Sequence, residues 1–188
     1  MPSINQSFLL ELKSDYSEYT TFIETGTLNG ETILHLEPYF DNLYTIEISE
    51  LYYNKAKSLY NGNKIRFILG DSSHVFANLL PNISDKCIFF LDGHWSCGDT
   101  GKGEKDCPLI EEIQHINNLY KNESIIIIDD LRLFGLSEKC GYPVNWGDIN
   151  KDTILNILND RILDVYTLDS EASKNDRLII HLKSNNQK

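Results

Sequence analysis

The sequence predicts an α/β domain with a doubly wound, mostly parallel sheet that ends in an antiparallel C-terminal strand. Apolar strand-like runs alternate with amphipathic helical segments along the whole chain. Two of these runs, CIFFL and IIII, are continuously apolar, as expected of strands that are buried on both faces. The last two strand-like segments are joined by a connection too short for a parallel crossover.

The length and composition are those of one globular domain. The chain has 188 residues, of which 41% are hydrophobic and 24% are charged, so residues 1–188 are expected to share one core. Its formal net charge of -11 disfavours nucleic acid and anionic membranes as partners. With no signal-peptide pattern and no apolar run long enough to span a bilayer, the sequence predicts a cytoplasmic protein.

The periodicity of apolar residues places the elements in order. A helix is expected over residues 4–16, with Phe8, Leu9 and Leu12 on one face. We expect strands at 20–25, 42–48, 64–69, 87–91, 124–128, 162–167 and 177–182, and helices at 31–39, 50–60, 73–80, 108–119 and 151–158. Since only nine residues, 168–176, separate the last two strands, they are predicted to form an antiparallel hairpin spanning about 162–183.

The turns after the first two strands have features of a nucleotide site. Ligands of such sheets bind at the carboxyl ends of the strands. Gly26 would let the backbone approach a ligand closely, and Gly30 would relieve crowding where the next helix begins. Glu47 ends the second strand, where a carboxylate can accept both hydroxyls of a ribose. An ordinary turn and a solvated strand end are the alternatives.

Asp71 and Ser72 follow the third strand. Asp71 is suited to accept a hydrogen bond from an adenine amino group, with Ser72 supplying backbone or hydroxyl contacts. Either residue is equally suited to cap the helix that follows. Capping and adenine contact are compatible with each other.

Three carboxylates follow the fourth and fifth strands. Asp92, Asp129 and Asp130 should lie at adjacent strand ends, where they repel one another unless a positive group lies between them. Mg²⁺ or a similar hard divalent cation, bound by oxygen ligands, would meet that need. Alternatively, Asp129 or Asp130 orients a loop or pairs with Arg132.

His94 begins a long polar loop, Gly93–Asp106. Its pKa near neutrality is suited to removing a proton from an acceptor hydroxyl, and the loop glycines indicate a lid. A structural role for His94 is the alternative. A zinc site formed by His94 with Cys97, Cys107 and Cys140 is disfavoured, because the spacings match no common zinc motif.

Several short motifs, in this order, resemble those of class I S-adenosylmethionine-dependent methyltransferases. They are IETGTLNGET, YTIEIS, GDSS, LDGH and IIIIDD, which cover about residues 20–135. IETG, LDG and the DD pair are similar to the metal-dependent macrocin O-methyltransferase group, which modifies sugars on natural products. The loop GHWSCGDTGKGEKDCPLIEEI resembles small methyltransferase-like proteins associated with polysaccharide biosynthesis.

The resemblance implies a three-layer Rossmann-like methyltransferase fold and a role for each matched residue. Glu24 and Gly26 would meet the methionine part of the cofactor, together with the other residues of that turn, Thr25, Thr27 and Gly30. Glu47 would hold the ribose, and Asp71 and Ser72 the adenine. Asp92 would contact the cofactor and take part in catalysis, and it would bind the metal with Asp129 and Asp130. Since relatives with sugar substrates lack a histidine after LDG, His94 as the base is this chain's own feature.

Together these observations predict an S-adenosylmethionine-dependent O-methyltransferase that acts on a hydroxyl of a small acceptor, such as a sugar or glycan precursor. Because the N-terminal helix leaves little material for a lid, a homodimer is one way to complete the site. Two alternatives remain: an NAD-dependent oxidoreductase, disfavoured by the C-terminal hairpin, and a non-catalytic cofactor- or metal-binding module.

Overall fold

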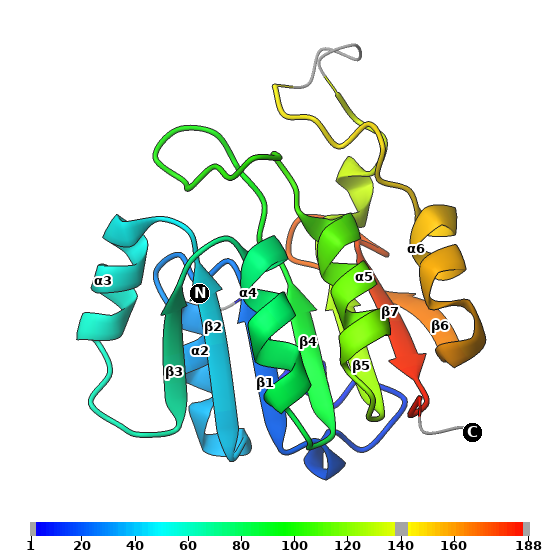
Figure 1. Cartoon of the computed structure of the whole chain (residues 1–188), viewed down its shortest axis with the longest axis horizontal. Helices are drawn as coiled ribbons and strands as arrows, with labels where there is room; N and C mark the ends of the chain where they lie inside the picture. The colour runs from blue at the N-terminus through cyan, green and yellow to red at the C-terminus, as the bar shows by residue number, and fades with distance from the viewer. Residues whose placement is uncertain (1–2, 138–142, 186–188) are drawn as a thin grey trace.

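The computed structural model describes residues 3–137 and 143–185. Within these residues one sheet of seven strands has the order β3-β2-β1-β4-β5-β7-β6 (Figure 1). The strands are β1 (Thr21–Thr25), β2 (Asn42–Glu47), β3 (Ile65–Leu69), β4 (Cys87–Leu91), β5 (Ser124–Ile128), β6 (Ile162–Leu168) and β7 (Arg177–Leu182). β1 to β5 pair in parallel, whereas β7 pairs antiparallel with both β5 and β6. The predicted parallel sheet with an antiparallel C-terminal strand is confirmed.

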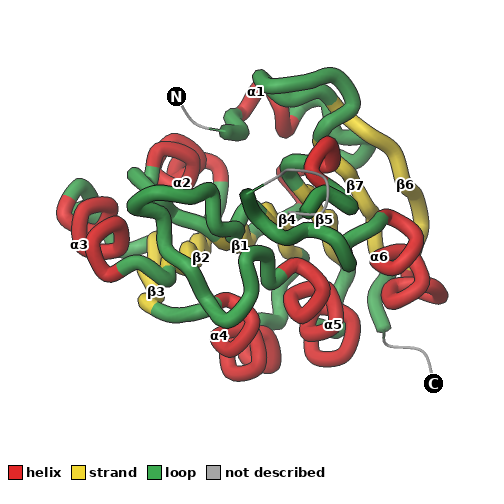
Figure 2. The backbone as a smooth tube through the Cα atoms, turned by 90° about the horizontal axis from the view of Figure 1, so that it is seen from above, coloured by secondary structure: helices red, strands yellow, loops and turns green. Residues whose placement is uncertain are grey.

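Helices cover both faces of the sheet (Figure 2). They are α1 (Gln6–Leu9), α2 (Glu31–Leu36), α3 (Glu50–Ser58), α4 (Ser72–Leu79), α5 (Leu109–Leu119) and α6 (Lys151–Leu158). On one face, residues of α4, α5 and α6 such as Phe76, Ile113 and Ile154 form one core cluster with the sheet. On the other face, α1 and α2 contribute Phe8 and Ile33 to a second cluster. The chain thus has the three layers that the sequence predicts.

The central strands explain why the apolar runs were informative. β4 and β5 have the predicted bounds, and every residue in both is buried. Alternate side chains of a strand point to opposite faces, so a strand covered by helices on both faces must be apolar throughout. The two runs therefore lie in the middle of the sheet, where their carboxyl ends meet the site.

The predicted helix over residues 4–16 is wrong, because only Gln6–Leu9 is helical. The chain turns after Leu9, and Leu10 is 68% exposed. The backbone N–H of Lys13 then donates to the hydroxyl of Tyr166 on β6 at 2.9 Å, and Lys13 Nζ pairs with Asp164 at 2.8 Å. These contacts with a distant strand replace the remaining helical turns. A local pattern of apolar residues does not reveal such long-range contacts.

Among the described residues, no helix has the length and apolar character needed to cross a lipid bilayer.

Arg161, before β6, holds the end of α5 against the sheet. Arg161 is only 4% exposed. Its guanidinium donates to the carbonyl oxygens of Ile116 at 3.0 Å and Asn122 at 3.1 Å. Weaker contacts reach the carbonyls of Asn117 and Lys183. One side chain therefore satisfies carbonyls from α5, the turn before β5 and the end of β7.

We expect Arg161→Met to lower the free energy of unfolding by roughly 2–4 kcal/mol, because it removes the guanidinium that donates to several carbonyls in a buried position. Urea unfolding at 25 °C measures the change. The matched control is Arg66→Met, which removes an exposed guanidinium bonded to the hydroxyl of Tyr44. If both substitutions changed the free energy of unfolding by the same small amount, Arg161 would not hold α5 against the sheet.

Candidate functional site

The candidate site lies where the turns after β1 and β4 come into close contact. Gly26 follows β1 with a φ of +83°, and a Cβ there would lie 2.5 Å from the carbonyl oxygen of Asp92. Glycine is required at this position both by the backbone conformation and by the close approach. The adjacent carboxyl ends of the parallel strands bring the predicted residues to one edge of the sheet.

A first cavity of about 190 Å³ opens at this edge. From the predicted residues it is lined by Gly26, Glu47, Asp71, Ser72, Asp92 and His94. The carboxylate of Glu47 accepts from the backbone N–H groups of Leu28 and Ser49, both at 2.8 Å. These two bonds fix an acidic group at the cavity wall.

Asp71 caps α4, as one of the two interpretations predicted. Its Oδ1 accepts from the backbone N–H of Ser73 at 3.0 Å and from the Ser73 hydroxyl at 2.6 Å. Its Oδ2 lies close to the position that a Cβ on Gly103 would occupy. The bonds to Oδ1 therefore hold the carboxyl group in place, and Oδ2 is left to face the first cavity.

The loop Gly93–Asp106, whose glycines predicted a lid, forms a wall of the first cavity. Figure 1 shows the loop, in green, extending above the strand ends toward α3. A Cβ on Gly101 would collide with Ile48 after β2, and one on Gly103 with Asp71 after β3. The two glycines in GKG were the available signal, since close backbone packing favours glycine.

Charged and aromatic contacts hold this loop in shape. Lys102 Nζ lies 2.7 Å from Asp106 Oδ1 and 4.0 Å from the ring centroid of Trp95. The N–H of Trp95 donates to the carbonyl of Asp106 at 2.7 Å, and Asp106 Oδ2 accepts from the N–H of Asn145 at 2.8 Å. These contacts join the two ends of the loop and tie it to Asn145; that the loop acts as a lid stays a prediction.

A third cavity, of about 290 Å³, continues from the first on the β1 side. It is lined by Glu24, Gly26, Thr27, Leu28 and Asp92, among others. Glu24 is 2% exposed and accepts from the Thr45 hydroxyl at 2.7 Å. Burial raises the pKa of Glu24 to about 8, against the opposing effect of that hydrogen bond.

Thr25 and Gly30, predicted to bind the cofactor, line none of these cavities. Thr25 is buried at the end of β1. Gly30 has a φ of +75°, and a Cβ there would lie 3.0 Å from the Cβ of Ala56 on α3. Gly30 therefore allows α2 and α3 to approach each other.

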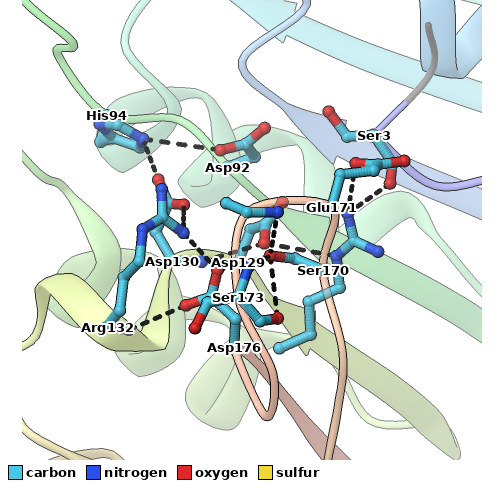
Figure 3. Close-up of polar contacts among 12 residues, drawn as sticks. Ser3, Asp92, His94, Asp129, Asp130, Arg132, Ser170, Glu171, Ser173 and Asp176 are labelled. Atoms are coloured by element: carbon cyan, nitrogen blue, oxygen red, sulfur yellow. Dashed lines mark hydrogen bonds and ion pairs between the residues drawn. The ribbon is translucent and has the colours of Figure 1, made fainter.

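A second cavity, of about 370 Å³, lies on the other side of Asp92 and His94. Its lining is mainly polar and includes Ser3, Ser96, Asp129, Asp130 and Arg132, with Asp92 and His94. His94 Nε2 lies 2.7 Å from Asp130 Oδ2 and 3.7 Å from Asp92 Oδ1 (Figure 3).

Asp129 and Asp130, two of the three predicted metal ligands, each pair with an arginine. Asp130 Oδ1 lies 2.6 Å from Arg132 Nη1, and Arg132 also bonds Asp176. Asp129 Oδ1 lies 3.3 Å from Arg177 Nε, on the first residue of β7. The pairing with Arg132 was the alternative noted for this acidic pair, whereas Arg177 was missed. A lone arginine at the head of the apolar run RLIIHL was its only signal.

The ionisable groups of this cluster shift one another's pKa values. Burial and the charge of Asp129 raise the pKa of Asp92 well above its usual range. Burial would also raise the pKa of Asp130, but His94 and Arg132 outweigh it, so this pKa is lowered. Burial alone would lower the pKa of His94, yet Asp130 and Asp92 outweigh it and raise it.

Two groups of side chains in the described part of the chain have ligand atoms close enough to hold a metal ion. One is Asp92, His94 and Asp130, and the other is Asp129, Asp130 and Asp176. In each group these atoms lie within 4.8 Å of one another. The structure thus groups the predicted ligands differently, because Asp129 turns toward Arg177. Cys140 of the zinc alternative lies outside the described residues.

Glu112 on α5 was also missed. This glutamate is 1% exposed, and its Oε1 has no hydrogen-bond partner in the structure. Oε1 faces the turn after β4, since a Cβ placed on Gly93 would lie 3.4 Å from it. Burial raises the pKa of Glu112 to about 7, because it removes water from the charged carboxylate. An acidic residue on the apolar face of a helix was the signal.

Comparison with protein-family models and with curated proteins finds no match to this sequence. Solved structures do match. The O-methyltransferase TomG from Streptomyces achromogenes, in complex with S-adenosylmethionine, has a TM-score of 0.60 and 15% identity over 89% of this chain and 74% of that one. Magnesium protoporphyrin IX methyltransferase from Synechocystis, with bound S-adenosylhomocysteine, has a TM-score of 0.57 and 16% identity over 89% and 75%.

The N-methyltransferase NodS from Bradyrhizobium japonicum is similar over nearly its full length. Its TM-score is 0.56 and its identity 13%, over 95% of this chain and 93% of that one. The chain therefore has the Rossmann-like fold of the S-adenosylmethionine-dependent methyltransferases, as the motifs indicated.

The contact between His94 and Asp130 gives a pH-dependent prediction. We expect Asp130→Asn to lower the pKa of His94, because it removes the hydrogen-bonded charge that favours the imidazolium. In the wild type, the stabilisation from this contact is complete below the ordinary histidine pKa of about 6.5. It is lost as the pH rises through the raised pKa.

NMR titration of the His94 imidazole in both proteins, with EDTA present, measures the shift. The control is Asp164→Asn, which changes an exposed carboxylate on β6 that pairs with Lys13. An unchanged pKa of His94 in Asp130→Asn would contradict the prediction.

Proposed function

We propose that this protein is an S-adenosylmethionine-dependent O-methyltransferase acting on a hydroxyl of a small acceptor, such as a sugar or glycan precursor. One observation carries the proposal: a cavity with Glu47 and Asp71 on its wall adjoins a polar cavity at Asp92 and His94. The first is suited to a nucleoside, and the second to a hydroxylated molecule. Their contact would bring donor and acceptor together, and such positioning supplies up to about 7–11 kcal/mol of barrier reduction.

The cofactor would extend through the first and third cavities. Glu47 is placed to accept from the ribose hydroxyls and Asp71 from the adenine amino group, with Ser72 beside it. The methionine end would lie beside Glu24, Gly26 and Thr27. The adenosyl ligands named for two of the similar structures support this choice of cofactor.

When bound, the cofactor supplies a methyl group activated by a sulfonium, whose S–C bond breaks as the acceptor oxygen forms a C–O bond. His94 takes the proton that the acceptor hydroxyl loses. In the neutral tautomer with Nε2–H donating to Asp130, Nδ1 is the base and can accept from the Ser96 hydroxyl at 3.3 Å. Once Nδ1 is protonated, it can donate to the Trp95 carbonyl oxygen, also at 3.3 Å. Ser96 lines both the first and the second cavity, so it marks where a proton can pass.

In place of the proton on Nε2 of His94, a divalent cation could be held by this nitrogen and the carboxylates of Asp92 and Asp130, which are common metal ligands. Such an ion would lower the pKa of an acceptor hydroxyl. Asp129 already has Arg177 as its counter-charge, and Asp130 has Arg132. Asp92 is therefore the carboxylate whose charge such an ion would balance most.

We expect S-adenosylmethionine and S-adenosylhomocysteine to bind saturably in calorimetric titrations, and NAD not to bind. Gly103→Ala should weaken both adenosyl ligands about fivefold to 100-fold, because the added methyl pushes the Asp71 carboxyl from its place. Binding of NAD alone would favour an oxidoreductase instead.

The matched control for this loop substitution is Gly98→Asn. Gly98 has a φ of +61° and open space around its Cβ position, and asparagine tolerates that conformation. Affinities equal to those of the wild type are expected. A loss as large as that of Gly103→Ala would place the effect in the loop as a whole rather than at Asp71.

We expect His94→Gln to reduce methyl transfer to a panel of hydroxylated sugars by roughly 10²–10⁴-fold, because the base is lost. Binding of S-adenosylhomocysteine should stay within about threefold of the wild type, or about 0.7 kcal/mol. Transfer is followed with tritiated methyl donor, with EDTA and with Mg²⁺. Unchanged turnover would exclude His94 as the base, and full activity in EDTA would exclude a required cation.

A further inference from the structure

Three cavities meet at one side chain. Asp92 lines the first cavity with Glu47, the second with Asp130, and the third with Glu24. Among the described residues it is the one that lines all three. The turn after β4 thus places a carboxyl where the three spaces join.

This carboxyl has the weakest counter-charge of the acidic cluster. Arg177 pairs with Asp129, and Arg132 with Asp130 and Asp176. His94 Nε2 lies 2.7 Å from Asp130 but 3.7 Å from Asp92. Asp92 has no arginine partner among the described residues, so a cation placed beside its carboxylate would be stabilised.

The sulfur of the proposed cofactor would lie at this side chain. The inference rests on the proposed function, in which the adenosyl part occupies the first cavity and the amino acid part the third. The sulfur joins these parts, and the residues shared by the two cavities are Gly26, Leu28 and Asp92. Of these, Asp92 has the only side chain that can carry a charge.

We propose that Asp92 selects ligands by the charge at this position, so that the site binds the cationic sulfonium of the methyl donor more tightly than the neutral thioether of the product. Methyl transfer breaks the S–C bond of the sulfonium and leaves a neutral thioether, while the acceptor proton leaves as in the proposed function. Asp92 attracts the neutral thioether less than the sulfonium, which favours release of the product.

The test compares three ligands by calorimetry in EDTA: S-adenosylmethionine, S-adenosylhomocysteine, and sinefungin, which carries an ammonium near the sulfur position. The wild type should bind both cationic ligands about tenfold more tightly than S-adenosylhomocysteine, or about 1.4 kcal/mol. In Asp92→Asn this ratio should fall below about twofold, with the affinity for S-adenosylhomocysteine unchanged or higher. Circular dichroism checks that the variant is folded.

Glu47→Gln is the matched control, since it removes a carboxylate at the ribose end of the first cavity. It should weaken all three ligands by similar factors and leave the ratio unchanged. If the wild type bound the cationic ligands and S-adenosylhomocysteine with equal affinity, the inference would be overturned and the proposed function would stand. This outcome is measured on the wild type alone. A ratio kept in Asp92→Asn would also overturn it. Failure of all three ligands to bind the wild type would instead count against the proposed function.

Discussion

The site depends on how the charges of its buried carboxylates are balanced. Arg177 and Asp129 form an ion pair whose side chains are 5% and 10% exposed. Removing one member of such a pair typically costs about 3–5 kcal/mol, because the other charge stays buried. With Asp129 turned toward Arg177, Asp130 pairs with His94 and Arg132, and Asp92 is left with His94 at 3.7 Å, where the three cavities adjoin. The arrangement of the site thus follows from which carboxylate is already paired with an arginine.

The antiparallel end of the sheet supplies these counter-charges. Arg177 begins β7, and its guanidinium also donates to the carbonyl of Ser3. Asp176, just before β7, accepts from the backbone N–H of Arg132 at 3.0 Å and from its guanidinium. The hairpin that distinguishes this fold from a fully parallel sheet therefore fixes both arginines and the N-terminal segment around the second cavity.

The sequence predicted what local physics determines. The strands β4 and β5 were placed with their observed bounds because burial on both faces leaves a continuous apolar run. The positions of Asp92 and Asp130 after these strands then followed from the parallel topology. The helix over residues 4–16 was wrong because Lys13 bonds to β6, more than 150 positions away. Arg177 was missed for the same reason, since its partner Asp129 comes from another strand.

The path of the loop after β4 shows the same limit. Its length, its glycines and its nearness to His94 could be recognised in the sequence, but its position depends on contacts with three other turns. Gly101 packs against Ile48 and Gly103 against Asp71, and Asp106 accepts from the backbone N–H of Asn145. Because Trp95 and Ser96 on this loop line both the first and the second cavity, a movement of the loop changes both spaces at once. The shape of the second cavity therefore depends on the contacts that hold the loop over the first.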